Sequence, residues 1–144
     1  MEIVIRKCVL NDCAAIRALN THEMGYSYTE EQTKAQLAAV LKDSSNAIFV
    51  AVNDDKVIGY THGAKYNLLY ADPMVNLLGI AVSEQFKKQG VGRALLKTLE
   101  AWALERGAVA IRLNSGAERS EAHKFYEKCG FIFKKSQYSF IMNI

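Results

Sequence analysis

The chain has 144 residues, half of them hydrophobic, which suits one domain with a single hydrophobic core. Its 18 basic and 15 acidic residues give a net charge of +3 and form no long run of like charge. This balance argues against a nucleic-acid or membrane partner, and we expect one domain over residues 1–144.

Cysteines and histidines show no pattern typical of a disulfide framework or a metal site. They are Cys8, Cys13 and Cys129, and His22, His62 and His123. The cysteines are odd in number with no CxxC pair, and no charged and apolar signal segment precedes Ile3. We therefore expect reduced thiols, a cytoplasmic location and no metal.

The first elements alternate between predicted strand and helix. Residues 3–7 (IVIRK) read as a strand, and Asn11 and Asp12 then offer N-caps to a helix with apolar residues at three-residue steps. Thr29 and Gln32 have the form of a capping box, which predicts a second helix.

The middle of the chain predicts three strands. Residues 47–52 and 57–66 are β-branched runs on either side of a turn-rich NDDK, the sequence form of a hairpin. Residues 75–82 are apolar at nearly every position, which predicts a central strand covered on both faces. Gly79 inside this run indicates a bulge or a close approach to the backbone.

The glycine-rich stretch FKKQGVGRALL spans residues 86–96 and opens a predicted helix that ends at Gly107. A short strand is predicted at residues 110–114, followed by a helix from about Ser120.

Two closing strands are predicted at the end of the chain, over residues 131–135 and 137–144. The order of elements favours a mixed α/β (α+β) fold with helices on both faces of the sheet.

A glycine-rich turn at a helix N-terminus is a typical anion site, because the first backbone N–H groups of a helix lack partners. A Walker A loop would need Lys and then Ser or Thr after Gly92, but Arg93 and Ala94 follow it. A dinucleotide fingerprint would need a small residue at Leu95 and an acidic residue at Asn114. Both patterns fail.

KKQGVG, residues 87–92, resembles the pyrophosphate-binding turn of the GNAT superfamily of acetyl-CoA-dependent N-acetyltransferases. That turn reads Gln or Arg, two residues, Gly, one residue, and Gly or Ala. Lys87 replaces the usual Arg or Gln, which keeps a cation near the phosphates. The preceding strand and AHKFYEKCGF, residues 122–131, also match the family in order and spacing, so the resemblance covers nearly the full chain.

The resemblance implies a mostly antiparallel central sheet with a splayed central strand, and acetyl-CoA as the acetyl-donor cosubstrate. In the family, the strand before the turn bulges and pairs its backbone with pantetheine, and the turn amides hold the pyrophosphate. The implied cofactor-binding residues are Ile80, Ala81, Val82, Lys87, Lys88, Gln89, Gly90, Val91, Gly92, Arg93, Asn114 and Tyr126. Asn114 is included because Arg119 stands where the family's NxxAxxxY motif has its Asn.

The implied reaction is attack of a neutral amine on the thioester through a tetrahedral oxyanion. It needs a base, an oxyanion donor and an acid for the departing thiolate. A backbone N–H of the splayed strand would be the donor, and Tyr126 matches the family's acid, although its spacing also suits a core aromatic. Many relatives have a glutamate where this chain has Asn76, so the base is open between His62, Glu23 and a water chain.

The acceptor is expected between the loops at residues 22–28 and 67–72. Glu23, Tyr26 and Tyr28 give an acidic and aromatic mixture that favours a small amine, a polyamine or an aminosugar over an acidic metabolite. The favoured function is N-acetyl transfer to a primary amine by direct attack in a ternary complex. The alternatives are a catalytically inactive acyl-CoA-binding regulatory module and a protein N-acetyltransferase. A homodimer is a further expectation, as in many relatives.

Overall fold

The computed structural model describes residues 2–144. It divides into two compact units, Met1–Leu113 and Asn114–Ile144. The first unit contains the whole described sheet, and the second contains one helix and an extended C-terminal segment.

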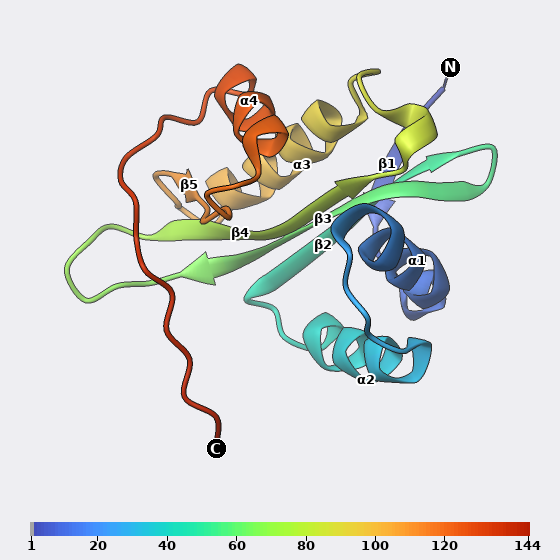
Figure 1. The fold of residues 1–144 in the computed structure, drawn as a ribbon, viewed down its shortest axis with the longest axis horizontal. Coiled ribbons are helices and arrows are strands. Elements are labelled where there is room, and N and C mark those ends of the chain that lie inside the picture. Colours follow the sequence, from blue (N-terminus) through green and yellow to red (C-terminus); the bar gives the residue numbers. More distant parts are fainter. Residues whose placement is uncertain (1) are drawn as a thin grey trace. The chain divides into compact units, whose positions relative to one another are not determined.

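Five strands and three long helices form the first unit. In chain order, its elements are β1 (Val4–Lys7), the 3₁₀ turn η1 (Leu10–Asp12), α1 (Cys13–Met24), α2 (Glu30–Leu41), β2 (Asn46–Asn53), β3 (Lys56–Tyr66), β4 (Met74–Val82), the 3₁₀ turn η2 (Glu84–Phe86), α3 (Val91–Glu105) and β5 (Ile111–Arg112). The strands lie in sequence order, with antiparallel pairs from β1 to β4 and a parallel β4–β5 pair. The predicted mixed, mostly antiparallel fold is confirmed (Figure 1).

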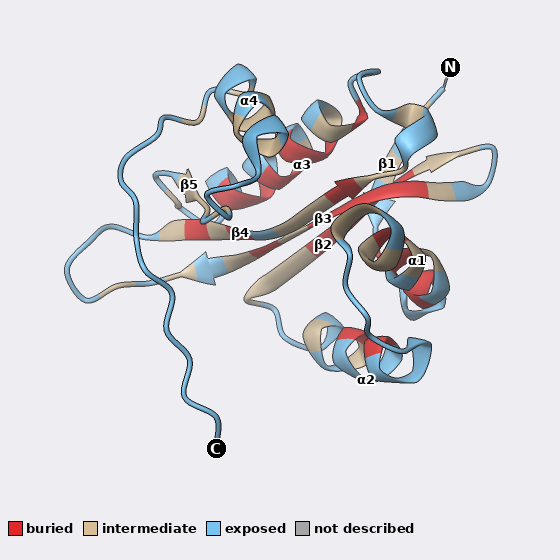
Figure 2. Cartoon of the chain, in the orientation of Figure 1, coloured by how far each residue is buried: buried red, intermediate tan, exposed pale blue. Residues whose placement is uncertain are grey.

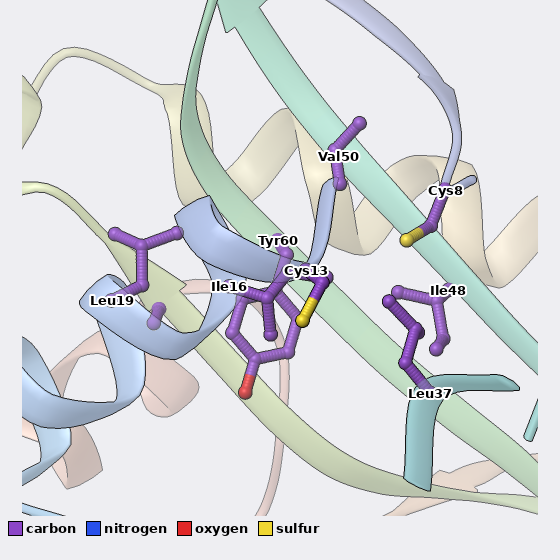
Figure 3. Close-up of a cluster of buried hydrophobic side chains, with 9 residues drawn as sticks. Cys8, Cys13, Ile16, Leu19, Leu37, Ile48, Val50 and Tyr60 are labelled. Atoms are coloured by element: carbon purple, nitrogen blue, oxygen red, sulfur yellow. The ribbon is translucent and has the colours of Figure 1, made fainter. Parts of the chain in front are cut away.

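Within the first unit, α1 and α2 pack on one face of the sheet and α3 on the other, and the buried residues of these three helices face the sheet (Figure 2). On one face, α1 and α2 build a cluster with the sheet, most of which is drawn in Figure 3: Cys8, Cys13, Ile16, Leu19, Leu37, Ile48, Val50, Tyr60 and Ala81. On the other face, Leu95 and Leu99 of α3 are fully buried. A Cβ on Gly63 would lie 2.6 Å from Leu99 Cδ1, so this glycine permits the close approach of α3.

The predicted N-cap of α1 is wrong in detail. Asp12 precedes α1, but its backbone is helical and its side chain does not cap that helix. The carboxylate instead accepts hydrogen bonds from the Val9 backbone N–H at 2.9 Å and from both terminal nitrogens of Arg6 at 2.8 and 2.9 Å. The nearby guanidinium lowers the pKa of Asp12. Asp12 therefore ties β1 to the turn before α1.

Two local predictions are confirmed. Thr29 and Gln32 form a reciprocal capping box at the start of α2, with each side chain bonded to the other's backbone N–H at 3.1 Å. The β2–β3 hairpin turns through Asp54 and Asp55, whose φ angles of 48° and 62° are those of a type I′ turn.

Strand β4 is less covered than predicted. It is the fourth of the five strands, and β5 shields its outer edge over two residue pairs. Leu78 is 52% exposed, and Asn76 is half-buried. Val75 and Leu77 are buried on the face of β4 that α3 covers, and Ala81 is buried in the cluster on the α1 and α2 face, so both faces are covered but not along the whole strand.

The second unit contains α4 (Ser120–Lys128), followed by Gly130 with a φ of 101°. The two closing strands are wrong: although fully described, residues 131–144 contain no strand. Figure 2 shows this segment exposed from residue 132 to the end of the chain. A strand needs a neighbouring edge for its backbone groups, and an alternating pattern alone does not supply one.

None of the helices in residues 2–144 combines the length and apolar character needed to cross a membrane. The three cysteines all lie in the described part of the chain and are free thiols. The cytoplasmic location stays a prediction.

Candidate functional site

The backbone of β4 is open along one edge beyond its start. Its inner edge pairs with β3 from Met74 to Val82. On its outer edge β5 is the neighbour among the described strands, and it pairs only with Val75 and Asn76. Residues 77–82 therefore turn unpaired backbone groups outward, in a form that an extended ligand could join as another strand.

A bulge interrupts β4 as predicted. His62 of β3 pairs with Gly79, but the next residue, Gly63, pairs with Leu77. Leu78 is thus the extra residue of the β4 strand. A bulge bends the strand and redirects its side chains and amides, so the open edge begins where β4 bends.

The glycine-rich turn leads from β4 into α3. Lys88 and Gly90 have φ angles of 63° and 85°, and α3 begins at Val91. The first helical hydrogen bond of α3 runs from the Ala94 N–H to the Gly90 carbonyl at 3.0 Å, and none of the described side chains caps this end. A Cβ on Gly90 would have no described atom within 4 Å. The turn is therefore an open cradle at the positive end of a helix, suited to a phosphate.

Lys87 and Glu23, which the sequence analysis treated separately, lie in contact. Lys87 Nζ is 3.0 Å from Glu23 Oε1 and 2.8 Å from Glu84 Oε2. The second oxygen of Glu23 accepts a hydrogen bond from the Glu84 backbone N–H at 3.2 Å. Hydrogen bonds to the two carboxylates, first to Glu84, raise the pKa of Lys87.

His62 lies on the α1 and α2 face of β3, beside the bulge. Its Nε2 is 2.7 Å from Asn46 Oδ1. An amide oxygen only accepts hydrogen bonds, so Nε2 carries the hydrogen and Nδ1 keeps its lone pair. Burial lowers the pKa of His62 below its usual 6.5. The imidazole is therefore neutral at pH 7, as a general base must be.

A tyrosine that the sequence analysis missed lies over Gly79. Tyr60 OH would be 3.4 Å from a Cβ placed on Gly79, and it donates a 2.5 Å hydrogen bond to Asn20 Oδ1 of α1. Burial, with a smaller effect of Tyr26, raises the pKa of Tyr60 to about 12. Strand alternation from His62 could have placed Tyr60 on the same face, opposite the predicted bulge.

Asn76, which the sequence analysis matched to a glutamate of many relatives, is held by β5. Arg112 Nη1 donates to Asn76 Oδ1 at 2.8 Å, and its guanidinium lies 4.5 Å from the centre of the Tyr66 ring. Asn76 thus accepts a hydrogen bond from a cation and has no carboxylate with which to take a proton. The Arg112 contact was missed because it joins strands 36 residues apart.

Tyr126 and Asn114 belong to the second unit. On α4, the ring of Tyr126 makes edge contacts with Phe125 and Phe131 at 5.6 and 5.7 Å between centroids. Burial raises the pKa of Tyr126, and the charge of Arg119 opposes this shift. The phenol therefore keeps its proton at neutral pH, as a general acid must.

A family model described as "Acetyltransferase (GNAT) family" matches residues 13–131. The chain belongs to the GNAT acetyltransferase family. It is an acetyl-CoA-dependent N-acetyltransferase, and the resemblance inferred from the glycine-rich turn is confirmed.

Two curated relatives and one solved structure illustrate the match. This GNAT protein is 29% identical over 132 residues to an aminoglycoside N(6')-acetyltransferase type 1 of Stenotrophomonas maltophilia, covering 88% of this chain and 84% of the relative. It is 26% identical over 121 residues to the N-acetylaspartate synthetase of Rattus norvegicus, covering 81% of this chain and 40% of the relative. The structure of AAC(6')-Iy in complex with the bisubstrate analogue CoA-S-monomethyl-acetylneamine has a TM-score of 0.88 at 20% identity and covers 100% of both chains. At that identity the last match shows the shared fold.

Acetyl-CoA is the acetyl donor of this GNAT acetyltransferase. The first unit suits such a molecule in two ways. The unpaired edge of β4 can accept an extended amide-containing chain, and the open N-terminus of α3 can accept a diphosphate.

Proposed function

We propose that the protein transfers the acetyl group directly from acetyl-CoA to the primary amine of a small molecule, with an aminosugar as the favoured class, in one ternary complex. The observation that carries this proposal is the polar cluster at the β4 bulge. His62 pairs across the strands with Gly79, and Tyr60 lies over the same glycine. A neutral base and the bent, open strand are therefore adjacent.

In the proposed mechanism, Nδ1 of His62 accepts the proton of the attacking amine, directly or through water. The Asn46 amide holds the imidazole in the tautomer that leaves Nδ1 unprotonated. A backbone N–H near Ile80 and Ala81 stabilises the oxyanion, and Tyr126 gives its proton to the thiolate of coenzyme A. Glu23 is the weaker candidate for the base, because both of its oxygens already accept hydrogen bonds or pair with a cation.

The His62→Ala variant tests the base. At pH 7, kcat/KM should fall by about a hundredfold or more, because general base catalysis is typically worth 10²–10⁴ in rate. The wild-type profile should have an acidic limb with its break below about pH 6.5, because protonation of His62 removes the base. That break should disappear in the variant, as measured by steady-state kinetics between pH 5 and 9.

Asn46→Asp is the companion variant. A carboxylate at Nε2 favours the charged imidazole and raises its pKa, so the acidic break should move to higher pH. A break that stays in place in both variants would remove His62 from the mechanism.

The preference for an aminosugar is supported by the aminoglycoside N(6')-acetyltransferase relative and by the exposed Tyr26 and Tyr28 of the loop after α1. Aromatic faces of this kind pack well against sugar rings. We expect kcat/KM for aminosugar amines to exceed that for aspartate and for peptide N-termini by at least about tenfold, or about 1.4 kcal/mol. A panel of these three amine classes, followed by thiol release, measures the order. A preference for aspartate or peptides would contradict the proposed acceptor.

We also propose that the protein forms a homodimer. The support is the C-terminal segment, in which seven large apolar side chains are more than 70% exposed: Ile132, Phe133, Tyr138, Phe140, Ile141, Met142 and Ile144. Large apolar side chains that are exposed together in one segment are typical of a protein interface. Light scattering should give twice the chain mass, and Phe140→Asp combined with Ile141→Asp should lower it to one chain. A monomeric wild type at about 50 μM, a concentration that saturates micromolar association, would contradict the dimer.

A further inference from the structure

The connection from β4 to α3 lies mostly on the surface, with Ser83 and Phe86 half-buried. Within Ser83–Gly90, the backbone N–H groups of Phe86 and Lys87 donate to carbonyls of the same segment, those of Ser83 and Glu84. Two further contacts join this segment to β3 and to α1. The Ser83 N–H donates to the Ile58 carbonyl at 2.7 Å, and Glu23 at the end of α1 contacts both Glu84 and Lys87.

Glu23 is the better shielded partner in this contact. Its side chain is 13% exposed, whereas those of Lys87 and Glu84 are 45% and 79% exposed. One carboxylate oxygen pairs with the Lys87 ammonium, and the other accepts the Glu84 backbone N–H. A carboxylate that bonds to a backbone amide and a side chain of one short segment fixes both the position and the direction of that segment.

The charges of the three side chains sum to −1, directly before a turn that must accept an anion. Lys87 Nζ lies within 3.0 Å of both carboxylates. Without its ammonium, two neighbouring carboxylates would repel a diphosphate at the start of α3.

We propose that Glu23 is a positioning residue for the pyrophosphate turn, and that Lys87 acts as the bridging counter-ion of Glu23 and Glu84 instead of contacting phosphate itself. Lys87 stands where the family turn usually has Arg or Gln, and the proposal gives it a different role from that of a phosphate ligand. The proposal concerns binding of the cofactor and does not depend on the acceptor or on the identity of the base.

Exchanging the charges of Lys87 and Glu23 distinguishes a bridging role of Lys87 from direct contact between Lys87 and phosphate. Lys87→Glu alone places three carboxylates together, and we expect it to weaken coenzyme A binding by about tenfold or more. Adding Glu23→Lys restores one cation between two carboxylates, with the wild-type net charge. We expect the double variant to recover at least about threefold of this loss, because the charge balance returns. Full recovery is not expected, since a lysine at position 23 cannot accept the hydrogen bond from the Glu84 N–H. Calorimetric titration with coenzyme A, without acceptor, measures each dissociation constant.

A double variant that binds coenzyme A no better than Lys87→Glu alone would overturn the proposal, because Lys87 would then be needed at its own position. Circular dichroism melts identify any variant that fails to fold.

Glu23→Gln is a second, independent test of the contact between Glu23 and the connection from β4 to α3. It keeps the size of the side chain but removes the charge that pairs with Lys87. Amide hydrogen exchange of residues 84–90 should speed up by about threefold or more, whereas Glu84→Gln, on a side chain that is 79% exposed, should change it less. Equal exchange in the wild type and Glu23→Gln would overturn the positioning role. A variant that loses turnover but keeps its affinity for coenzyme A would argue against the proposed mechanism and not against the positioning role of Glu23.

Discussion

Replacing Gly92 with Asp should abolish detectable binding of acetyl-CoA while the fold stays largely intact. Gly92 is the second residue of α3, where backbone N–H groups precede the first helical hydrogen bond. The substitution places a Cβ and a carboxylate where a phosphate must approach those amides. We expect the dissociation constant measured by calorimetry to rise by at least about a hundredfold, or about 2.8 kcal/mol.

Gly92→Asn is the matched control, because it has nearly the same shape without the charge. Its affinity should fall by less than that of Gly92→Asp, and the difference reports the repulsion between carboxylate and phosphate. A melting temperature close to that of the wild type is expected, since Gly92 is not part of the buried core. Unchanged affinity in Gly92→Asp would move the pyrophosphate site away from this turn.

Replacing Tyr126 with Phe should slow the chemical step and leave cofactor binding nearly unchanged. The substitution removes one oxygen and keeps the ring that contacts Phe125 and Phe131. General acid catalysis is typically worth 10²–10⁴ in rate, so the single-turnover rate should fall by at least about tenfold. Single-turnover measurement is needed because slow product release could hide part of the loss in kcat.

Tyr138→Phe is the control for this change, because Tyr138 is a 91% exposed tyrosine of the same unit. It should keep the wild-type rate. A Tyr126→Phe variant with full single-turnover rate would remove the phenol from the mechanism and leave the family assignment in place.

Local sequence signals predicted most of the first unit. The Thr29 capping box, the hairpin turn at Asp54 and the bulge at Gly79 depend on a few neighbouring residues, and each formed as expected. The glycine-rich turn was also readable, because its special backbone angles and the following helix are encoded within about ten residues.

Contacts between distant segments were not predictable in the same way. Glu23 and Lys87 are 64 residues apart, and sequence alone offered them as a separate base and phosphate ligand. Arg112 reaches Asn76 only because β5 pairs with β4 there. The pattern of residues 131–144 suits a strand, but whether a strand forms depends on an edge that the pattern does not name.

The most direct test of the account mixes the protein with one equivalent of acetyl-CoA and follows free thiol, first alone and then after addition of an aminosugar. Direct transfer in a ternary complex predicts no thiol release above slow hydrolysis in the first stage. In the second stage it predicts one equivalent of coenzyme A together with one equivalent of N-acetylated sugar by mass spectrometry. An equivalent of thiol before the amine is added would indicate an acetylated protein, and none after addition of any amine in the panel would indicate a module that binds acetyl-CoA without transferring its acetyl group. Either result would contradict the proposed mechanism.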